Sequence, residues 1–236
     1  LFRSAVKQLG PKADYRVFDV TDTANAVPFV ETLTQEIGPV SILVNNAGRH
    51  CKKPVLDVTQ EDLQSVLDVH LMGSFALTKA VVPGMLERKK GNILFISSMS
   101  AYLGMTQVTA YSAAKSAVLG LVKTLSGELA DKGIRVNAIA PGFIDTPMFR
   151  KAVESDIPRQ QKIIGHTPMG CYGDPMDIGW AAVGLPSPAA PVCTAGCLPL
   201  ECRHRTGFLT VMQPSVCSRH FKRIHEAETP EERRWS

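Results

Sequence analysis

Hydrophobic and polar positions follow two different periods along the chain, and the two periods alternate from residue 1 to about residue 183. Short apolar runs that are typical of strands occupy residues 15–18, 41–44, 92–96 and 135–139. Stretches with helical periodicity cover residues 1–9, 22–36, 59–88, 109–131 and 174–182. Strands that alternate with helices in this way are typical of βα units. We therefore expect an α/β fold with a doubly wound parallel sheet.

Local signals refine the predicted helix at 59–88. Thr59 precedes it and Asp62 follows three residues later, close to the capping-box pattern that satisfies backbone N–H groups at a helix start. Interruptions are expected near Gly73 and near Pro83-Gly84, because glycine and proline disfavour a helix interior. A loop with short helices is expected at about 145–165.

The pattern changes towards the C-terminus. Residues 184–202 are rich in cysteine and in proline, and a helix interior does not tolerate proline. Residues 203–236 have no sustained periodicity and hold seven Lys and Arg against four Glu. We therefore expect one partial domain over 1–202 and an irregular basic tail over 203–236.

Composition narrows the function classes. The 236 residues are 44% hydrophobic and 20% charged, as in a globular chain with one core. We see neither a bilayer-spanning apolar run nor a signal peptide, so we expect a cytoplasmic protein without a membrane partner. Positive charge concentrated in an irregular tail also argues against a nucleic-acid partner. Since the chain begins with Leu1 rather than Met, we expect a fragment.

The cysteines do not predict a metal site. A cluster late in the chain could supply ligands, but its spacing matches no pair of CxxC motifs. Its members are Cys197, Cys202, His204, Cys217 and His220. Disulfides are not expected without an export signal. We therefore expect incidental cysteines and no bound metal.

Three side chains form a candidate catalytic group, because ligands bind at the carboxyl ends of strands in parallel α/β sheets. Ser98 follows the strand at 92–96, whereas Tyr111 and Lys115 lie four residues apart on one helix face. An ammonium group near a phenol lowers its pKa, which would make Tyr111 a general acid/base. Taken alone, such a pair is more often a packing Tyr beside a solvated Lys. Any hydride would have to come from a cofactor.

In this order and spacing, the motifs resemble the short-chain dehydrogenase/reductase family over about residues 1–201. The matching motifs are Asp19-Val20, Asn45-Asn46-Ala47-Gly48, Ser98, Tyr111-x-x-x-Lys115, and Pro141-Gly142 with Thr146. The resemblance implies a Rossmann-like fold and NAD or NADP as cofactor. It also implies a homo-oligomer, a dimer or tetramer, that forms through the helices at 60–88 and 109–131.

The resemblance assigns roles to the candidate residues. Ser98 would orient the substrate oxygen, Tyr111 would be the general acid/base, and Lys115 would bind the nicotinamide ribose and tune Tyr111. The other implied cofactor contacts are Asp19, Val20, Asn46, Ala47, Gly48, Pro141, Gly142, Ile144 and Thr146. For Asn45 a structural turn and a cofactor contact remain equally open.

The chain departs from the family pattern at three places. His70 stands where the family usually has an Asn that supports a proton relay; the His would be either a relay group or a buried structural residue. No glycine-rich turn, which in the family holds the cofactor pyrophosphate, precedes residue 45. We therefore expect that the sheet lacks its first two strands and that the chain binds cofactor poorly. The segment 15–18 would then pair with 41–44 or stand apart. Residues 187–201 resemble the family's final strand segment with altered ends.

Two regions bear on the substrate. Residues 97–111 and 166–178 resemble the gluconate 5-dehydrogenase-like branch, which implies a sugar acid, a polyol or a similar small alcohol or ketone. Reductases of acyl-carrier substrates share much of this pattern, so a 3-oxoacyl thioester is the alternative substrate. The alternative function is a catalytically silent truncated member of the family, or a subunit that serves only for interaction.

Overall fold

The computed structural model describes residues 6, 8–153, 156–165, 167 and 169–200. By its contacts the chain divides into two units, 1–203 and 204–236, and the described residues all belong to the first. The basic tail expected at 203–236 therefore lies outside the described residues, as do four of the five residues of the cysteine–histidine cluster, all except Cys197. Everything that follows concerns the first unit.

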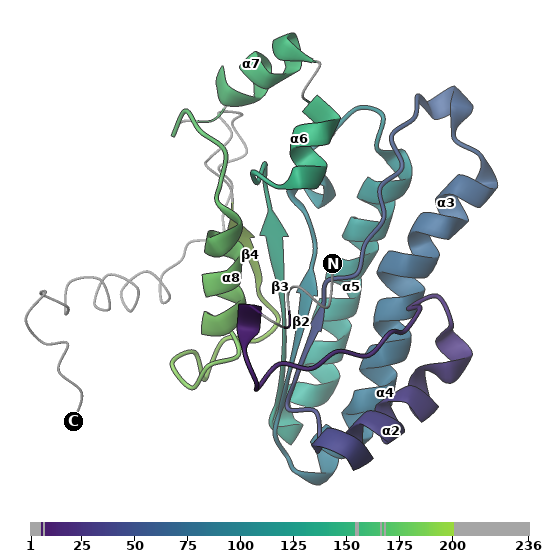
Figure 1. Ribbon diagram of the computed structural model, residues 1–236, viewed down its shortest axis with the longest axis vertical. Coiled ribbons are helices and arrows are strands. Elements are labelled where there is room, and N and C mark those ends of the chain that lie inside the picture. The colour runs from purple at the N-terminus through teal and green to yellow at the C-terminus, as the bar shows by residue number, and fades with distance from the viewer. Residues whose placement is uncertain (1–5, 7, 154–155, 166, 168, 201–236) are drawn as a thin grey trace, which may run out of the picture. The chain divides into compact units, whose positions relative to one another are not determined.

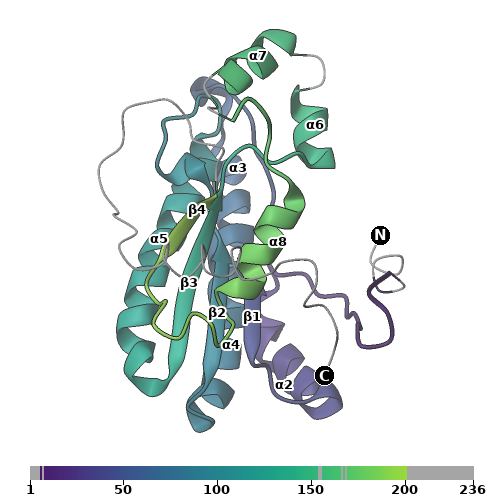
Figure 2. The same ribbon diagram turned by 90° about the vertical axis from the view of Figure 1, so that its left-hand side faces the viewer.

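A four-stranded parallel sheet forms the centre of this unit. Its strands are β1 (Ile42–Asn45), β2 (Gly91–Ile96), β3 (Ile134–Pro141) and β4 (Cys197–Leu200). They lie in the order β1-β2-β3-β4, and every neighbouring pair is parallel (Figure 2). The expected α/β fold with a parallel sheet is confirmed, and the final strand that residues 187–201 suggested is present as β4.

The prediction of a strand at residues 15–18 is wrong. Residues 13–19 have no regular secondary structure, and Val17 is 86% exposed. This segment instead packs on the following helix, where Phe18 stacks on Phe29 with ring centroids 4.3 Å apart. Arg16 pairs with Glu36 of the same helix at 2.8 Å. A short apolar run forms a strand only where a neighbouring strand supplies hydrogen bonds, and among the described residues β1 bonds only to β2.

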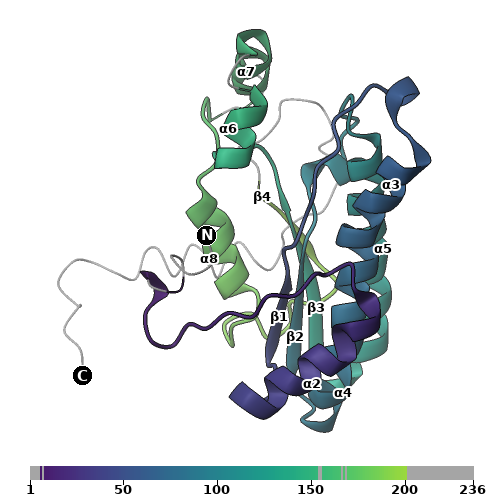
Figure 3. The same cartoon turned by 45° about the vertical axis from the view of Figure 1, so that its right-hand side comes forward.

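Helices cover both faces of the sheet (Figures 1 and 3). One face carries α2 (Ala26–Ile37), α3 (Gln60–Leu67), α4 (Ser74–Glu87) and α5 (Thr109–Leu129). The other face carries α8 (Pro175–Gly184), while α6 (Pro147–Val153) and α7 (Ile157–Gly165) lie beyond the carboxyl end of β3. Single 3-10 turns occupy Thr23–Asn25, Val55–Asp57, Met99–Ala101 and Ala130–Lys132. This is the layered arrangement expected of a doubly wound fold.

The helical stretch from Gln60 to Glu87 begins as predicted and differs inside. Thr59 and Asp62 form a complete capping box, with the Asp62 N–H donating to Thr59 Oγ1 at 3.1 Å. The interruption near Gly73 is a π-helix (η3, Asp68–Gly73) that links α3 to α4. At Pro83 the expected break is absent, because the proline is accommodated within α4.

Alternating strand residues build a core on each face of the sheet, as the two-residue period requires. The larger cluster lies under α4 and α5 and consists of Val30, Val81, Met85, Ile93, Phe95, Val118, Val122, Leu129, Ile134, Val136 and Ala138. A smaller cluster under α8 consists of Leu94, Ile139 and Ala181. The positions on β2 and β3 are therefore fixed from both sides, which holds the strand ends steady.

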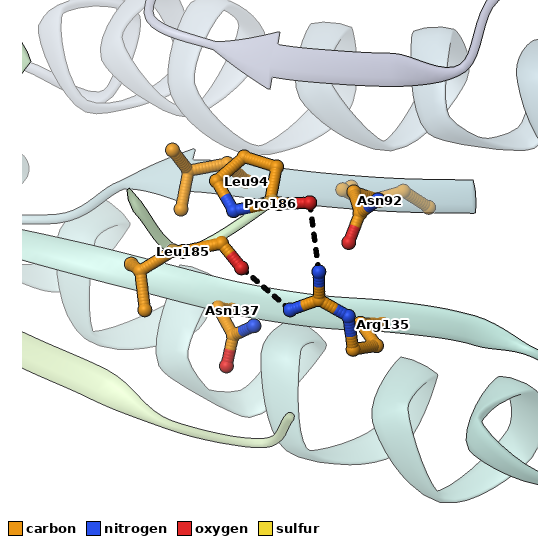
Figure 4. Close-up of a pocket in the computed structure, with 7 residues that line it drawn as sticks. Asn92, Leu94, Arg135, Asn137, Leu185 and Pro186 are labelled. Atoms are coloured by element: carbon orange, nitrogen blue, oxygen red, sulfur yellow. Dashed lines mark hydrogen bonds between the residues drawn. The ribbon is translucent and has the colours of Figure 1, made fainter. Parts of the chain in front are cut away.

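Arg135 holds the loop that leads to β4. Its Nη2 donates to Pro186 O at 2.8 Å and its Nη1 donates to Leu185 O, as Figure 4 shows. Asn137, two residues on along β3, donates to Cys193 O at 2.7 Å. Side chains of β3 therefore satisfy the carbonyl groups of a loop that has little secondary structure of its own.

One helical stretch, Gln60–Glu87, is long and apolar enough by length and composition alone to cross a membrane, which the sequence analysis did not expect. Within its most apolar window 33% is buried in the structure. Val81 and Met85 from this stretch contribute to the core against the sheet. Core helices of globular proteins meet the same criterion, so the finding carries no membrane assignment.

Candidate active site

The side chains predicted to carry chemistry meet where β2 ends and α5 begins. Ser98 lies two residues beyond β2, and its Oγ accepts a hydrogen bond from Ser100 N at 3.1 Å. Tyr111 and Lys115 project from the first turns of α5, with Lys115 Nζ 5.5 Å from the centroid of the Tyr111 ring. The structure thus brings together three residues that the sequence separates by up to seventeen positions.

Lys115 is a buried cation, with only 5% of its surface exposed. Its Nζ donates to Ile96 O at 2.5 Å, and Ser97 Oγ donates to Lys115 O at 3.0 Å, so two bonds tie α5 to the end of β2. Burial lowers the pKa of Lys115 from 10.5 to about 8, because a charged group loses hydration there. The side chain is therefore fixed in place and poorly solvated.

Tyr111 lies between two imidazole rings. The His50 ring centroid is 5.1 Å away in a tilted arrangement, and the His70 ring meets the phenol edge-on at 5.4 Å. Burial raises the pKa of Tyr111 above its ordinary value of 10.0, and a side-chain hydrogen bond with Ser98 opposes that rise. This differs from the expected lowering by Lys115, because desolvation of the buried phenol is the largest influence on its pKa.

His70 is held by the π-helix and is buried beside Tyr111. Its Nε2 lies 2.8 Å from Arg49 O and 3.2 Å from Arg49 N, so it donates to the carbonyl in one tautomer and accepts from the N–H in the other. Nδ1 is buried and has no hydrogen-bond partner among the described residues. Burial, followed by the charge of Lys115, lowers the pKa of His70 to about 4, so the ring is neutral near neutral pH.

Gly48 lets the loop after β1 approach this histidine closely. A Cβ atom at Gly48 would lie 2.8 Å from His70 Cε1, closer than side chains pack. The same turn contains Asn46 and Ala47, both exposed. Asn45 is buried and its Nδ2 donates to Thr78 Oγ1 at 3.2 Å, which anchors the turn on α4 and favours the structural role left open above.

The remaining predicted cofactor residues lie on two further segments. Asp19 accepts hydrogen bonds from the backbone N–H and hydroxyl of Thr21, which lower its pKa. Val20 approaches η3 so closely that a Cβ at Gly73 would lie 2.5 Å from Val20 O. The segment 19–20 therefore reaches the helix that carries His70 although it forms no strand.

Beyond β3 the chain turns across the carboxyl end of the sheet. Pro141 ends the strand, and Gly142 N donates to Leu200 O at 2.9 Å. Ile144 forms a parallel bridge with Gly173, and Thr146 Oγ1 accepts from Phe149 N at 3.1 Å at the start of α6. These contacts fix the backbone of the segment that the family pattern assigns to the cofactor; the assignment itself stays a prediction.

His50 is a site neighbour of Tyr111 that was not predicted from the sequence. The residue lies two positions beyond Gly48, on the loop that returns towards α5, where Lys53 N donates to Gln107 O at 3.0 Å. Cys51 of this loop packs against Ala110 and Ala114 of α5. The loop is thus fastened over the first turn of α5, which explains why the His50 ring rests against Tyr111. Its position directly after the Asn-Asn-Ala-Gly turn was the available signal.

Comparisons with known proteins identify the family of this chain. Residues 2–156 match the family model described as short chain dehydrogenase. A 3-oxoacyl-[acyl-carrier-protein] reductase from Thermotoga maritima is 37% identical over 75% of this chain and 70% of its own length. A 2-dehydro-3-deoxy-D-gluconate 5-dehydrogenase from Formosa agariphila is 35% identical over 80% of this chain and 69% of its own.

Solved structures lead to the same family. A gluconate 5-dehydrogenase from Burkholderia cenocepacia, in complex with NADP and tartrate, superposes with a TM-score of 0.80 at 30% identity, covering 85% of this chain and 78% of the other. An NAD+-bound xylitol dehydrogenase superposes with a TM-score of 0.79 at 31% identity, covering 84% and 82%. Both carry the type of cofactor that the sequence predicted. The chain belongs to the short-chain dehydrogenase family and is an oxidoreductase of the Rossmann-like α/β class.

Proposed function

We propose that this chain interconverts a secondary alcohol and a ketone on a small substrate, a sugar acid or a polyol, with NAD or NADP as hydride carrier. The observation that carries the proposal is the placement of Tyr111 and Lys115 on one face of α5, beside Ser98 at the end of β2. A buried phenol, a buried ammonium and a hydroxyl at one strand end are the groups that proton transfer to or from a substrate oxygen requires.

The residues present fit the nicotinamide end of such a cofactor. Lys115 is an ammonium group with three donor hydrogens, and a single acceptor, Ile96 O, is bound to it among the described residues. Two donors are therefore available for ribose hydroxyl groups, and loading the site would compensate the lost hydration. When bound, the cofactor supplies or accepts the hydride that no side chain can.

Ser98 and Tyr111 position the substrate oxygen and exchange a proton with it. Ser98 Oγ lies next to Tyr111 and can donate a hydrogen bond to the substrate oxygen, which holds the reacting carbon at the phenol. The raised pKa of Tyr111 keeps its hydroxyl protonated near neutral pH, which suits proton donation to a ketone oxygen. In the direction of alcohol oxidation, Tyr111 takes that proton back.

His70 is proposed to continue the proton path. Its neutral ring presents Nδ1, which has no hydrogen-bond partner among the described residues, in the buried space around Tyr111. A water molecule there could hydrogen-bond to Nδ1 and relay the proton that Tyr111 exchanges. Without such a water molecule, burial of an unpartnered polar nitrogen is unfavourable, which supports the relay over the purely structural role.

The substrate class rests on the relatives. Gluconate and xylitol dehydrogenases among the solved neighbours support a sugar acid or polyol. A 3-oxoacyl thioester remains the second candidate, since a 3-oxoacyl-[acyl-carrier-protein] reductase and an acetoacetyl-CoA reductase are 37% and 39% identical to the chain. We also propose a homo-oligomer, for which exposed apolar groups on α4 and η3 offer a surface.

The test follows NADH or NADPH absorbance while the purified chain is offered gluconate, xylitol and acetoacetyl-CoA. We expect turnover of at least one substrate, and Tyr111→Phe lowers kcat by about 10²- to 10⁴-fold because it removes the exchangeable proton. The matched control is Tyr102→Phe, at an exposed tyrosine three residues beyond Met99. A Tyr111→Phe variant as fast as the unmodified chain would contradict the mechanism, and absence of turnover on all three substrates would contradict the function.

A further inference from the structure

Three consecutive residues at the carboxyl end of β2 each bind a different part of α5. Ile96 O accepts the hydrogen bond from Lys115 Nζ at 2.5 Å, and Ser97 Oγ donates to Lys115 O at 3.0 Å. Ser98 forms a side-chain hydrogen bond with Tyr111. The proposed function uses the other side chains at this junction directly, but it gives no task to Ser97.

Ser97 is bound to the sheet as well as to the helix. It is only 1% exposed, and its backbone N–H donates to Ile139 O of β3 at 2.7 Å. Its side chain lies on the face of the sheet that α5 covers, as does that of Phe95 two residues earlier, because side chains alternate along a strand. Ser97 therefore connects a fixed point of the sheet to the main chain of α5.

The hydrogen bond from Ser97 is additional to those that form α5. Lys115 lies inside this helix, where a main-chain carbonyl accepts from the N–H four residues later. A carbonyl oxygen has two lone pairs, so the Ser97 hydroxyl binds Lys115 O without competing with the helix. The bond thus sets where α5 lies relative to β2, rather than whether the helix forms.

Both ends of the Lys115 residue are therefore held by neighbouring residues of one strand end. Ser97 holds its main chain and Ile96 O holds its Nζ, which lies 5.5 Å from the centroid of the Tyr111 ring. A side chain of this length has several rotatable bonds, and fixing only its tip would leave the path of its chain open. With its main chain also fixed, the ammonium group has one defined location.

We propose that Ser97 is a positioning residue, which holds Lys115 so that its ammonium group stays beside Tyr111 at the end of β2. The inference rests on the proposed function, because it concerns the same site. It adds a residue that touches neither substrate nor cofactor and acts only through Lys115.

The first experiment measures the pKa of Lys115 without cofactor or substrate. Burial lowers this pKa from 10.5 to about 8, and the titratable groups nearby are Tyr111 on the same helix and His70 on η3. In Ser97→Ala the ammonium group is free to move towards water, so we expect the pKa to rise by about 1 or more. Nuclear magnetic resonance of protein labelled with carbon-13 at the lysine Cε atoms follows the titration, and the spectrum of Lys115→Met identifies the signal.

Ser126→Ala is the matched control. Ser126 is a second buried serine, 2% exposed, on the same helix, and its hydroxyl is bonded to Thr194 Oγ1 at 2.7 Å. Its replacement also removes a buried hydroxyl group and its hydrogen bond, but it should leave the pKa of Lys115 near 8. Ser97→Thr keeps a hydroxyl group and should lie closer to the unmodified chain than Ser97→Ala does.

Cofactor binding and kinetics give the second measurement. Ser97→Ala should raise the Kd of NADH or NADPH, measured by fluorescence, by about 3- to 10-fold, because an ammonium group in several positions binds ribose hydroxyls less well. It should lower kcat/KM by about 5- to 50-fold and shift its pH profile, whereas Ser126→Ala should change kcat/KM by less than about 2-fold. A purely structural role would lower the stability of both variants and shift neither the pKa nor the pH profile.

The outcomes separate the two proposals. An unchanged pKa of Lys115 in Ser97→Ala, or an equal rise in Ser126→Ala, overturns the inference, while the proposed function stands if Tyr111→Phe still abolishes turnover. If the unmodified chain turns over no substrate, the proposed function fails, and a rise in pKa confined to Ser97→Ala still supports the inference. Circular dichroism verifies folding. If Ser97→Ala is not folded, Ser97→Cys, which keeps the size but donates weakly, is titrated in its place and judged by the same outcomes.

Discussion

Lys115 carries a buried charge that lowers the stability of the fold near neutral pH. Its pKa of about 8 lies below the ordinary 10.5, so the folded state binds this proton less tightly than the unfolded state does. At pH values below 8 both states are protonated and the penalty is fully present. As the pH rises from 8 to 10.5 the folded protein releases the proton first, and the penalty disappears.

Lys115→Met is therefore expected to raise the free energy of unfolding by about 1–3 kcal/mol near neutral pH, although it removes a catalytic group. Burying a methionine avoids the desolvation penalty, and loss of the bond to Ile96 O offsets part of the gain. Urea denaturation of both proteins measures the difference, with Lys123→Met as the control. The gap should close near pH 10; a variant less stable than the unmodified chain near neutral pH would contradict this account.

His70 offers a second test at the same scale. His70→Asn keeps a polar side chain like the one the family pattern has here, whereas His70→Leu has nearly the same shape without polar atoms. If the residue relays protons, we expect the Leu variant to lose about 10- to 100-fold in kcat and to show an altered pH profile. The Asn variant should stay close to the unmodified chain. Equal loss in both variants would indicate a structural role only.

At the scale of elements, the hydrophobic periodicity correctly predicted the helices and strands whose hydrogen bonds are local or whose side chains are buried. The helices α3 and α5 and the strands β2 and β3 lie close to the expected ranges, because their apolar faces both specify the element and fill the core. The strand predicted at 15–18 is absent because a strand needs a neighbouring strand. The apolar side chains of a segment do not show whether such a neighbour is present.

The site was predicted only where a family motif marks it. Ser98, Tyr111, Lys115 and His70 converge as expected, but the raised pKa of Tyr111 depends on burial, which spacing does not report. His50 belongs to an irregular segment whose approach to Tyr111 is set by distant contacts, such as the bond from Lys53 N to Gln107 O. Tertiary contacts of this kind leave no periodic signal.

At the scale of the whole molecule, exposed apolar groups on η3 and α4 support the proposed homo-oligomer. Met72 is 47% exposed and Phe75 is 41% exposed, on the helical stretch that the family resemblance places at a subunit face. Clusters of large apolar side chains at a surface commonly mark protein interfaces.

Phe75→Asp should therefore convert an oligomer into a monomer, because it places a charge where apolar side chains would pack. Light scattering coupled to size exclusion measures the mass. The control is Leu56→Asp, since Leu56 is 93% exposed on a 3-10 turn outside this surface. An unchanged mass for Phe75→Asp, or dissociation of both variants, would contradict the assignment. The cytoplasmic location likewise stays a prediction.

The π-helix Asp68–Gly73 changes the rotation about the helix axis between α3 and α4, which pack against different elements. α3 packs against α5, whereas α4 lies against α2 and β2. Successive residues of an α-helix are about 100° apart around its axis, and a π turn accommodates one residue more than an α turn. Deleting one residue here would rotate either His70 away from Tyr111 or Val81 and Met85 away from the sheet. A single inserted residue thus allows both the contact of His70 with Tyr111 and the packing of Val81 and Met85 against the sheet. This stretch should therefore not tolerate a change in length.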